Sequence, residues 1–128
     1  MKKEIGHASY EAIVSLFKEL TPPFVVASES ANAIEIIGNT PALYGSTKKT
    51  IPGMYFASLV VRKDALSLHF FPIYVEPSLT EGIPDSLLSK LTGKTCFTFK
   101  ENHDIDLKSL KKLLKKGAVL WKKKGYLK

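Results

Sequence analysis

Few side chains in this 128-residue sequence could take part in chemistry, and none stands at a spacing that known catalytic sites use. The three histidines, His7, His69 and His103, lie far apart and form no H-x-x-x-H pair. His69 is the most interesting, because it falls inside an expected strand and an imidazole titrates near neutral pH. It could bind a ligand or carry a proton in a shallow cleft, or it could hydrogen-bond to a strand neighbour. We therefore expect a protein that is not an enzyme, with no metal site and no cofactor.

The single cysteine, Cys96, could act as a nucleophile only with a base beside it. Its chain neighbours are Thr95 and Phe97, and small thiols are common inside sheets, so we expect an inert thiol in or beside the core. One cysteine cannot form a disulfide within the chain, and this is typical of a reducing compartment. The N-terminus lacks the apolar stretch of a signal peptide. We expect a cytoplasmic protein.

The element that must position His69 is a β-hairpin made of residues 55–62 and 65–71, with Lys63 and Asp64 as its two-residue loop. This loop sets the register, and one face then carries only apolar side chains, namely Ala57, Leu59, Val61, Leu66, Leu68 and Phe70. The other face is mixed, with Ser58 opposite His69 and Val60 opposite Ser67. An antiparallel sheet with one covered and one wetter face has this pattern. We expect function on the mixed face.

The rest of the chain alternates between apolar periodic segments and turn signals. We expect a helix over 8–20, strands over 24–27, 33–37 and 42–44, a loop over 45–53, a short helix over 84–91, a strand over 95–99 and a closing helix from Leu107, capped by Asp104 or Asp106. The sequence thus predicts one α+β domain over residues 1–128. Its antiparallel sheet should have the N-terminal and C-terminal helices packed on one face.

The closing helix carries most of the positive charge. Residues 108–128 hold nine lysines and no acid, whereas residues 1–107 hold ten basic and twelve acidic residues, which leaves the net charge at +7. A basic face at Lys111, Lys112, Lys115 and Lys116 could bind nucleic acid, or it could be a solvated surface. Arg62 is the only arginine, so nucleic acid is the less favoured partner. The apolar arc of this helix is needed by the sheet, and no apolar run is long enough to cross a bilayer, so we expect no membrane association. Gly117 lies in that arc, where it predicts a close approach to the sheet.

Four amphipathic aromatic residues could line a ligand cleft or a partner surface, or could be boundary residues with one wet end. They are Tyr44, Tyr55, Tyr74 and Trp121.

Several segments together make the chain similar to the YdhG-like family of small bacterial domains, most of which have no known function. These segments are Tyr44, residues 53–57 (GMYFA), 71–74 (FPIY), 91–99 (LTGKTCFTF), 113–117 (LLKKG) and 125–126 (GY). The resemblance implies a fold like that of the type III secretion chaperones, an antiparallel sheet with helices on one side. Some members are described as frataxin-like iron-binding proteins, a role that would use acidic groups on the first helix and a sheet edge. The acidic residues of that helix here are Glu11 and Glu19.

These observations favour a non-enzymatic binding or adaptor domain. The candidate binding residues are Ser58, His69, Tyr44, Tyr55 and Tyr74, and the partner could be another protein or a second copy of the chain. The alternatives are a frataxin-like iron-binding protein and a weak nucleic-acid binder through the lysine-rich helix.

Overall fold

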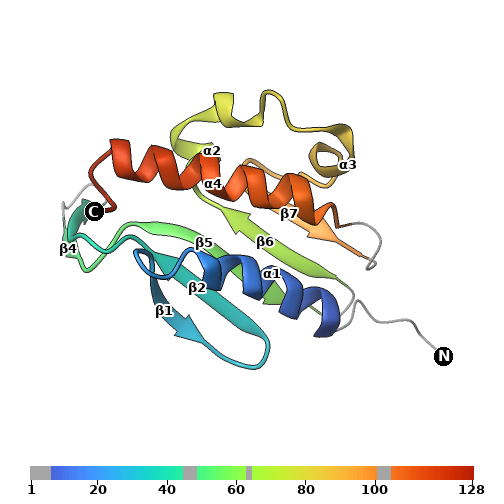
Figure 1. Ribbon diagram of the computed structural model, residues 1–128, viewed down its shortest axis with the longest axis horizontal. Helices are drawn as coiled ribbons and strands as arrows, with labels where there is room; N and C mark the ends of the chain where they lie inside the picture. The colour runs from blue at the N-terminus through green and yellow to red at the C-terminus, as the bar shows by residue number, and fades with distance from the viewer. Residues whose placement is uncertain (1–6, 45–48, 63–64, 101–104) are drawn as a thin grey trace.

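The computed structural model describes residues 7–44, 49–62, 65–100 and 105–128, and it shows an α+β fold built on a five-stranded antiparallel sheet (Figure 1). The strands follow the order β1-β2-β5-β6-β7, with bounds β1 Val25–Glu29, β2 Ala33–Ile37, β5 Tyr55–Val61, β6 Leu66–Phe70 and β7 Cys96–Phe99. Helices α1 (His7–Glu19) and α4 (Leu107–Lys123) both lie on the same side of this sheet. We call the opposite side the open face.

Smaller elements connect the main ones. Strands β3 (Ala42–Tyr44) and β4 (Lys49–Ile51) form a two-stranded sheet of their own. The segment between β6 and β7 contains the short helix α2 (Pro72–Val75), the 3₁₀ turn η1 (Pro77–Thr80) and the short helix α3 (Asp85–Leu88). No helix of the described ranges has the length and apolar character needed to cross a membrane.

The central hairpin has the register that the sequence predicts. Ala57 pairs with Phe70, Leu59 with Leu68 and Val61 with Leu66, and on the other face Ser58 pairs with His69 and Val60 with Ser67. The amide of Arg62 donates to the carbonyl of Ala65 at 2.7 Å, which closes the ladder beside the loop. The predicted loop residues Lys63 and Asp64 themselves lie outside the described part.

The covered face of the hairpin is the floor of the hydrophobic core. Leu59, Leu68 and Phe70 are fully buried, as are Phe17 of α1 and Trp121 of α4. Each helix presents an apolar stripe at helical spacing to the sheet, which is how amphipathic helices bury surface. The prediction that both terminal helices cover this face is confirmed.

A β-bulge at the start of β5 places two neighbouring side chains on the covered side. Ile36 pairs with Ala57, but Ile37 pairs with Tyr55, so Phe56 is the extra residue. Phe56 is fully buried, and its ring lies against that of Phe24 at 4.1 Å between centroids. Because the extra residue interrupts the alternation of side chains between the two faces, Tyr55 and Ser58 both extend over the open face.

Four elements differ from expectation. Strand β4 lies in the expected loop over 45–53, because its backbone pairs with β3 although its own side chains show no apolar alternation. Helix α2 lies where the sequence predicted no helix. Its apolar residues form a helical turn, since a proline at the first helical position needs no hydrogen-bond donor. Helix α3 is shorter than predicted and is preceded by Pro84 as its N-cap. Strand β1 extends to Glu29.

Candidate functional site on the open face

A line of polar side chains crosses the open face, one from each of four adjacent strands. Glu35 pairs with Ser58, Ser58 with His69, and His69 with Cys96, so the four residues lie side by side across β2, β5, β6 and β7. All four are half-buried. We call them the polar row. Two of its members, Ser58 and His69, were predicted as a pair, and the order of strands adds Glu35 and Cys96.

The thiol of Cys96 has a base beside it. Its Sγ lies 3.9 Å from Nε2 of His69, which is within reach of a weak sulfur hydrogen bond. The half-buried position agrees with the expected location beside the core, but the nearby imidazole was not predicted. Sequence reasoning missed it because the two residues stand 27 positions apart and meet only through the pairing of β6 with β7.

Tyr55 extends over the polar row from the bulge. Its hydroxyl and Oγ of Ser58 lie 2.7 Å apart, and either atom could be the donor. Burial raises the pKa of the Tyr55 phenol, and the charges of Glu35 and Cys96 raise it further, while the hydrogen bond to Ser58 acts in the opposite direction. The phenol therefore stays protonated at neutral pH, where it can donate a hydrogen bond.

A hollow of about 450 Å³ lies at one end of the row, between the main sheet and the end of β4. It is lined by Ala27, Glu35, Ile37, Ile51, Pro52, Gly53 and Tyr55. Glu35 and Tyr55 thus belong both to the hollow and to the site around the polar row. Position 53 must be glycine, because a Cβ there would overlap the carbonyl oxygen of Gly38. This close approach of two backbones shapes the floor of the hollow.

The other predicted aromatic residues have separate positions. Tyr74 is 61% exposed, and its ring stacks on that of Phe71 with centroids 5.5 Å apart. Phe71 in turn lies 5.7 Å from Tyr55, so the three rings form a chain that leads away from the polar row. Trp121 is fully buried, and its Nε1 donates to the carbonyl of Met54 at 3.4 Å, which makes it a core residue. The side chain of Tyr44 lies outside the described part.

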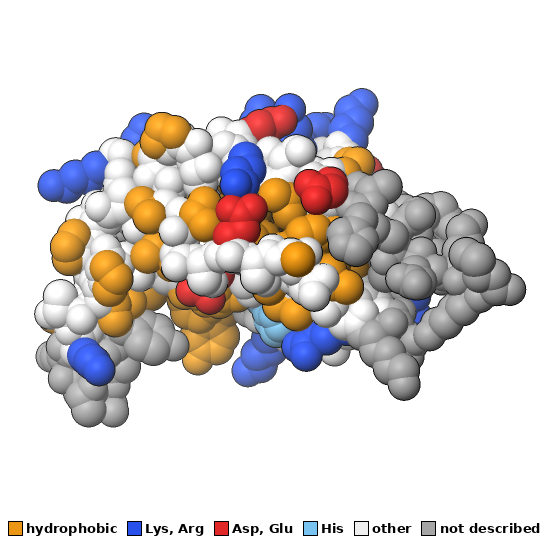
Figure 2. Space-filling view, turned by 90° about the horizontal axis from the view of Figure 1, so that it is seen from below, with side chains coloured by type: hydrophobic (Ala, Val, Ile, Leu, Met, Phe, Trp, Pro, Cys, Tyr) orange, Lys and Arg blue, Asp and Glu red, His pale blue; other side chains and the backbone are white. Residues whose placement is uncertain are grey.

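The side chains of the open face are not uniformly exposed to solvent. Ser67, expected on the wetter side of the hairpin, is only 8% exposed between its strand partners Val60 and Thr98. Figure 2 shows the neighbouring surface at the β1 edge, where hydrophobic side chains lie between acidic ones and a basic side chain lies against an acidic one in the middle of the view. This surface mixes apolar and charged groups.

The predicted basic face lies on α4, away from the open face. Lys111, Lys112, Lys115 and Lys116 are all exposed, and Nζ of Lys111 lies 3.4 Å from the carboxylate of Glu19 on α1. One of the four lysines is thus engaged in an ion pair between the two helices.

A frataxin-like iron site would need a cluster of acidic or imidazole ligands. Within the described ranges, no three side chains of His, Cys, Asp or Glu converge in this way. Glu11 and Glu19 are exposed on α1. The side chains of His7 and His103 lie outside the described part. The donor set that iron would require is therefore not assembled among the described residues.

Comparison with protein-family models, with curated proteins and with solved structures found no match.

Proposed function

We propose that this protein is a non-enzymatic binding domain whose open face takes a small organic cation with an apolar body. The observation that carries this proposal is the hollow in which a half-buried carboxylate, Glu35, and a protonated phenol, Tyr55, stand among apolar walls. Small-molecule sites are concave and mostly apolar, with a few polar groups that fix the orientation of the ligand. A volume of about 450 Å³ suits a ligand of one or two rings.

The charge of the ligand follows from Glu35. No basic side chain of the described residues forms an ion pair with this carboxylate, so a bound ammonium group would be its partner. The ring of Tyr55 can contribute a cation–π contact to the same group. Ile37, Ile51 and Pro52 would contact the apolar body of the ligand.

Benzylamine and benzyl alcohol test this proposal, because they have the same ring but only the first is a cation. Backbone amide shifts of the full chain are followed by NMR as each probe is added. We expect benzylamine to bind in the millimolar range and to shift the amides of Ile37, Ile51 and Tyr55, and we expect benzyl alcohol to bind several-fold more weakly.

The substitution Glu35→Gln should remove the preference for the amine. Its matched control is Glu29→Gln, which removes the same charge from the same sheet at a residue that pairs with Lys18 at 2.9 Å. A response confined to residues outside the hollow, or an equal response in both variants, would contradict the proposal. Light scattering at several concentrations shows whether a second copy of the chain occupies the open face, and a dimer that excludes benzylamine would also overturn it.

The YdhG-like resemblance and its secretion-chaperone-like fold also stand as proposals. They are supported by the antiparallel sheet with both terminal helices on one side. A cytoplasmic, reducing compartment is proposed on the ground of the single cysteine, Cys96.

A further inference from the structure

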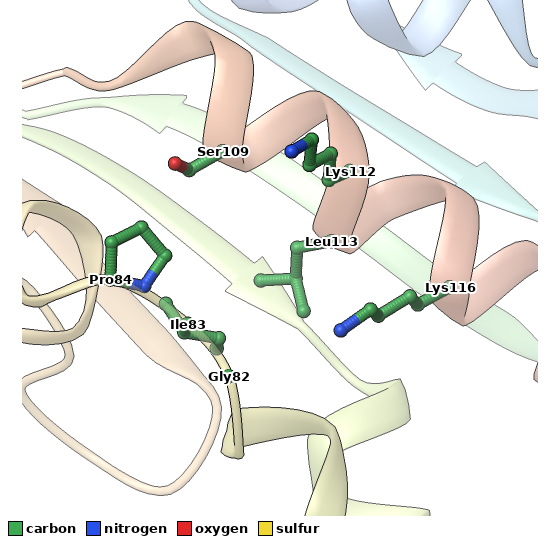
Figure 3. A pocket seen from close by; sticks show the side chains of 7 residues that line it. All are labelled: Gly82, Ile83, Pro84, Ser109, Lys112, Leu113 and Lys116. Atoms are coloured by element: carbon green, nitrogen blue, oxygen red, sulfur yellow. The ribbon is translucent and has the colours of Figure 1, made fainter.

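A second hollow lies on the helix side of the molecule, between α4 and the chain that follows η1 (Figure 3). We call it the α4 pocket. Its volume is about 240 Å³, and it is lined by Gly82, Ile83, Pro84, Ser109, Lys112, Leu113 and Lys116. In Figure 3 the amino group of Lys116 extends from α4 toward the segment that contains Gly82 and Ile83, and the amino group of Lys112 lies beside α4 on the side of Ser109. The pocket therefore has a cationic wall and an opposing wall made by a loop.

The two lysines of this wall stand four residues apart on one helix, so their like charges repel each other. Nζ of Lys116 lies 3.8 Å from the place where a side chain on Gly82 would begin, which puts the amine over the loop. Neither lysine forms an ion pair with a residue in the described ranges, whereas the neighbouring Lys111 pairs with Glu19. An anion between Lys112 and Lys116 would relieve the repulsion and give both charges a partner.

The remaining residues of the pocket are apolar, or their polar groups already have hydrogen-bond partners. Leu113, Ile83 and Pro84 offer apolar surface beside the lysines. Ser109 donates from Oγ to Asp106 at 2.7 Å, and Asp106 also accepts from Ser86 at 2.6 Å. These bonds hold the carboxylate at the N-terminal end of α4. The lysine end is therefore where an anion would be best compensated.

We propose that the α4 pocket binds the phosphate group of a small phosphomonoester. The phosphate lies between Lys112 and Lys116, and the organic part lies on Leu113 and Ile83. Lysine ammonium groups are common ligands of phosphate, and the apolar floor favours a substituted phosphate over the free ion. This site goes beyond the proposed function, because it lies on the helix side and takes a ligand of opposite charge.

Two double variants with the same net charge test the site. The variant Lys112→Gln/Lys116→Gln removes both pocket amines, and the control Lys111→Gln/Lys115→Gln removes two lysines from the same turns of α4 that do not line the pocket. Phenyl phosphate is titrated into each full-length variant and followed by amide NMR shifts. We expect the pocket variant to lose about tenfold or more in affinity and the control to change by less than about threefold. Circular dichroism checks that both remain folded.

Three further probes test whether the phosphate group is required and which kind of molecule supplies it. Phenol has the ring without the phosphate, and binding as tight as that of phenyl phosphate would overturn the proposal. Phosphatidylcholine vesicles with phosphatidic acid offer the same phosphate as a lipid headgroup, and binding lost only in the pocket variant would assign the site to that source. The third probe is a single-stranded oligonucleotide. If both double variants weaken its binding equally and phenyl phosphate does not compete with it, the lysines form only a diffuse basic face, and the proposal is overturned. The absence of binding to both phosphate probes would also overturn it.

Discussion

The ring of Phe70 on β6 packs directly against Gly117 of α4. A Cβ placed on Gly117 would lie 2.5 Å from Cζ of Phe70 and 3.1 Å from Cε1 of Phe56. Both rings are fully buried, so neither has room to move away. The long helix can lie this close to the sheet only because position 117 carries no side chain.

The substitution Gly117→Ala should destabilise the protein. An alanine gains about 1 kcal/mol in helix propensity, but overpacking a filled core costs about 1–3 kcal/mol, and the clash with two buried rings puts the cost at the upper end. We expect a net loss of about 1–2 kcal/mol in the free energy of unfolding, measured by urea denaturation. Gly93→Ala is the control, because a Cβ there meets only Cβ of Cys96 at an ordinary 3.9 Å. Equal stabilities of the two variants would contradict this account of the packing.

The substitution Gly53→Ala should be more damaging than Gly117→Ala. The new Cβ would overlap the carbonyl oxygen of Gly38, and this backbone atom, whose residue is tied to Met54 by a backbone hydrogen bond of 2.9 Å, yields less than a ring edge. We expect a loss of about 3 kcal/mol in the free energy of unfolding. Because Gly53 lines the hollow, this variant should also show changed amide shifts at Ile37 and Tyr55. A stability like that of the unaltered protein would contradict the close approach of the backbones at Gly38 and Gly53.

The substitution Tyr55→Phe should remove the hydrogen bond to Ser58 and cost about 1 kcal/mol. Because the pKa of the Tyr55 phenol is raised above its ordinary 10.0, the neutral form stabilises the fold below that value, and this contribution is lost as the pH rises through the folded-state pKa. The variant should therefore lose less stability between neutral and alkaline pH. Phenolate absorbance should show one late-titrating tyrosine fewer. Tyr10→Phe is the comparison, because burial raises the pKa of Tyr10 as well.

Asp106 should stabilise α4 in a pH-dependent way. Hydrogen bonds from the side chains of Ser86 and Ser109, and then from the backbone of Ser109, lower the pKa of Asp106 below its ordinary 3.8. Its contribution is present above that value and is lost as the pH falls through the folded-state pKa. Asp106→Ala should cost about 1 kcal/mol at neutral pH. Asp106→Asn should retain most of the cap but lose the acid dependence, which urea denaturation at neutral and acid pH will measure.

Much of the fold is visible in the sequence because it depends on local relationships. The central hairpin has a loop of two residues, so the partner of Ser58 follows from counting outward from Lys63 and Asp64. The helix that contains Phe17 and the one that contains Trp121 follow from apolar residues at a period near 3.6. Asp106 was one of two expected caps, and it is the one that bonds to the amide of Ser109. The other, Asp104, lies outside the described part.

The site depends on relationships that the sequence does not contain. Nothing near Ser58 and His69 in the chain shows that β2 and β7 flank the hairpin, and this order alone brings Glu35 and Cys96 into the polar row. The α4 pocket likewise exists only because the chain after η1 passes beside Lys112 and Lys116. The sequence by itself determined the elements, the register of the hairpin and its covered face, because these follow from side-chain periodicity and one short loop. Tertiary structure decided which polar and charged groups meet, because strand order and helix docking are set by long-range packing.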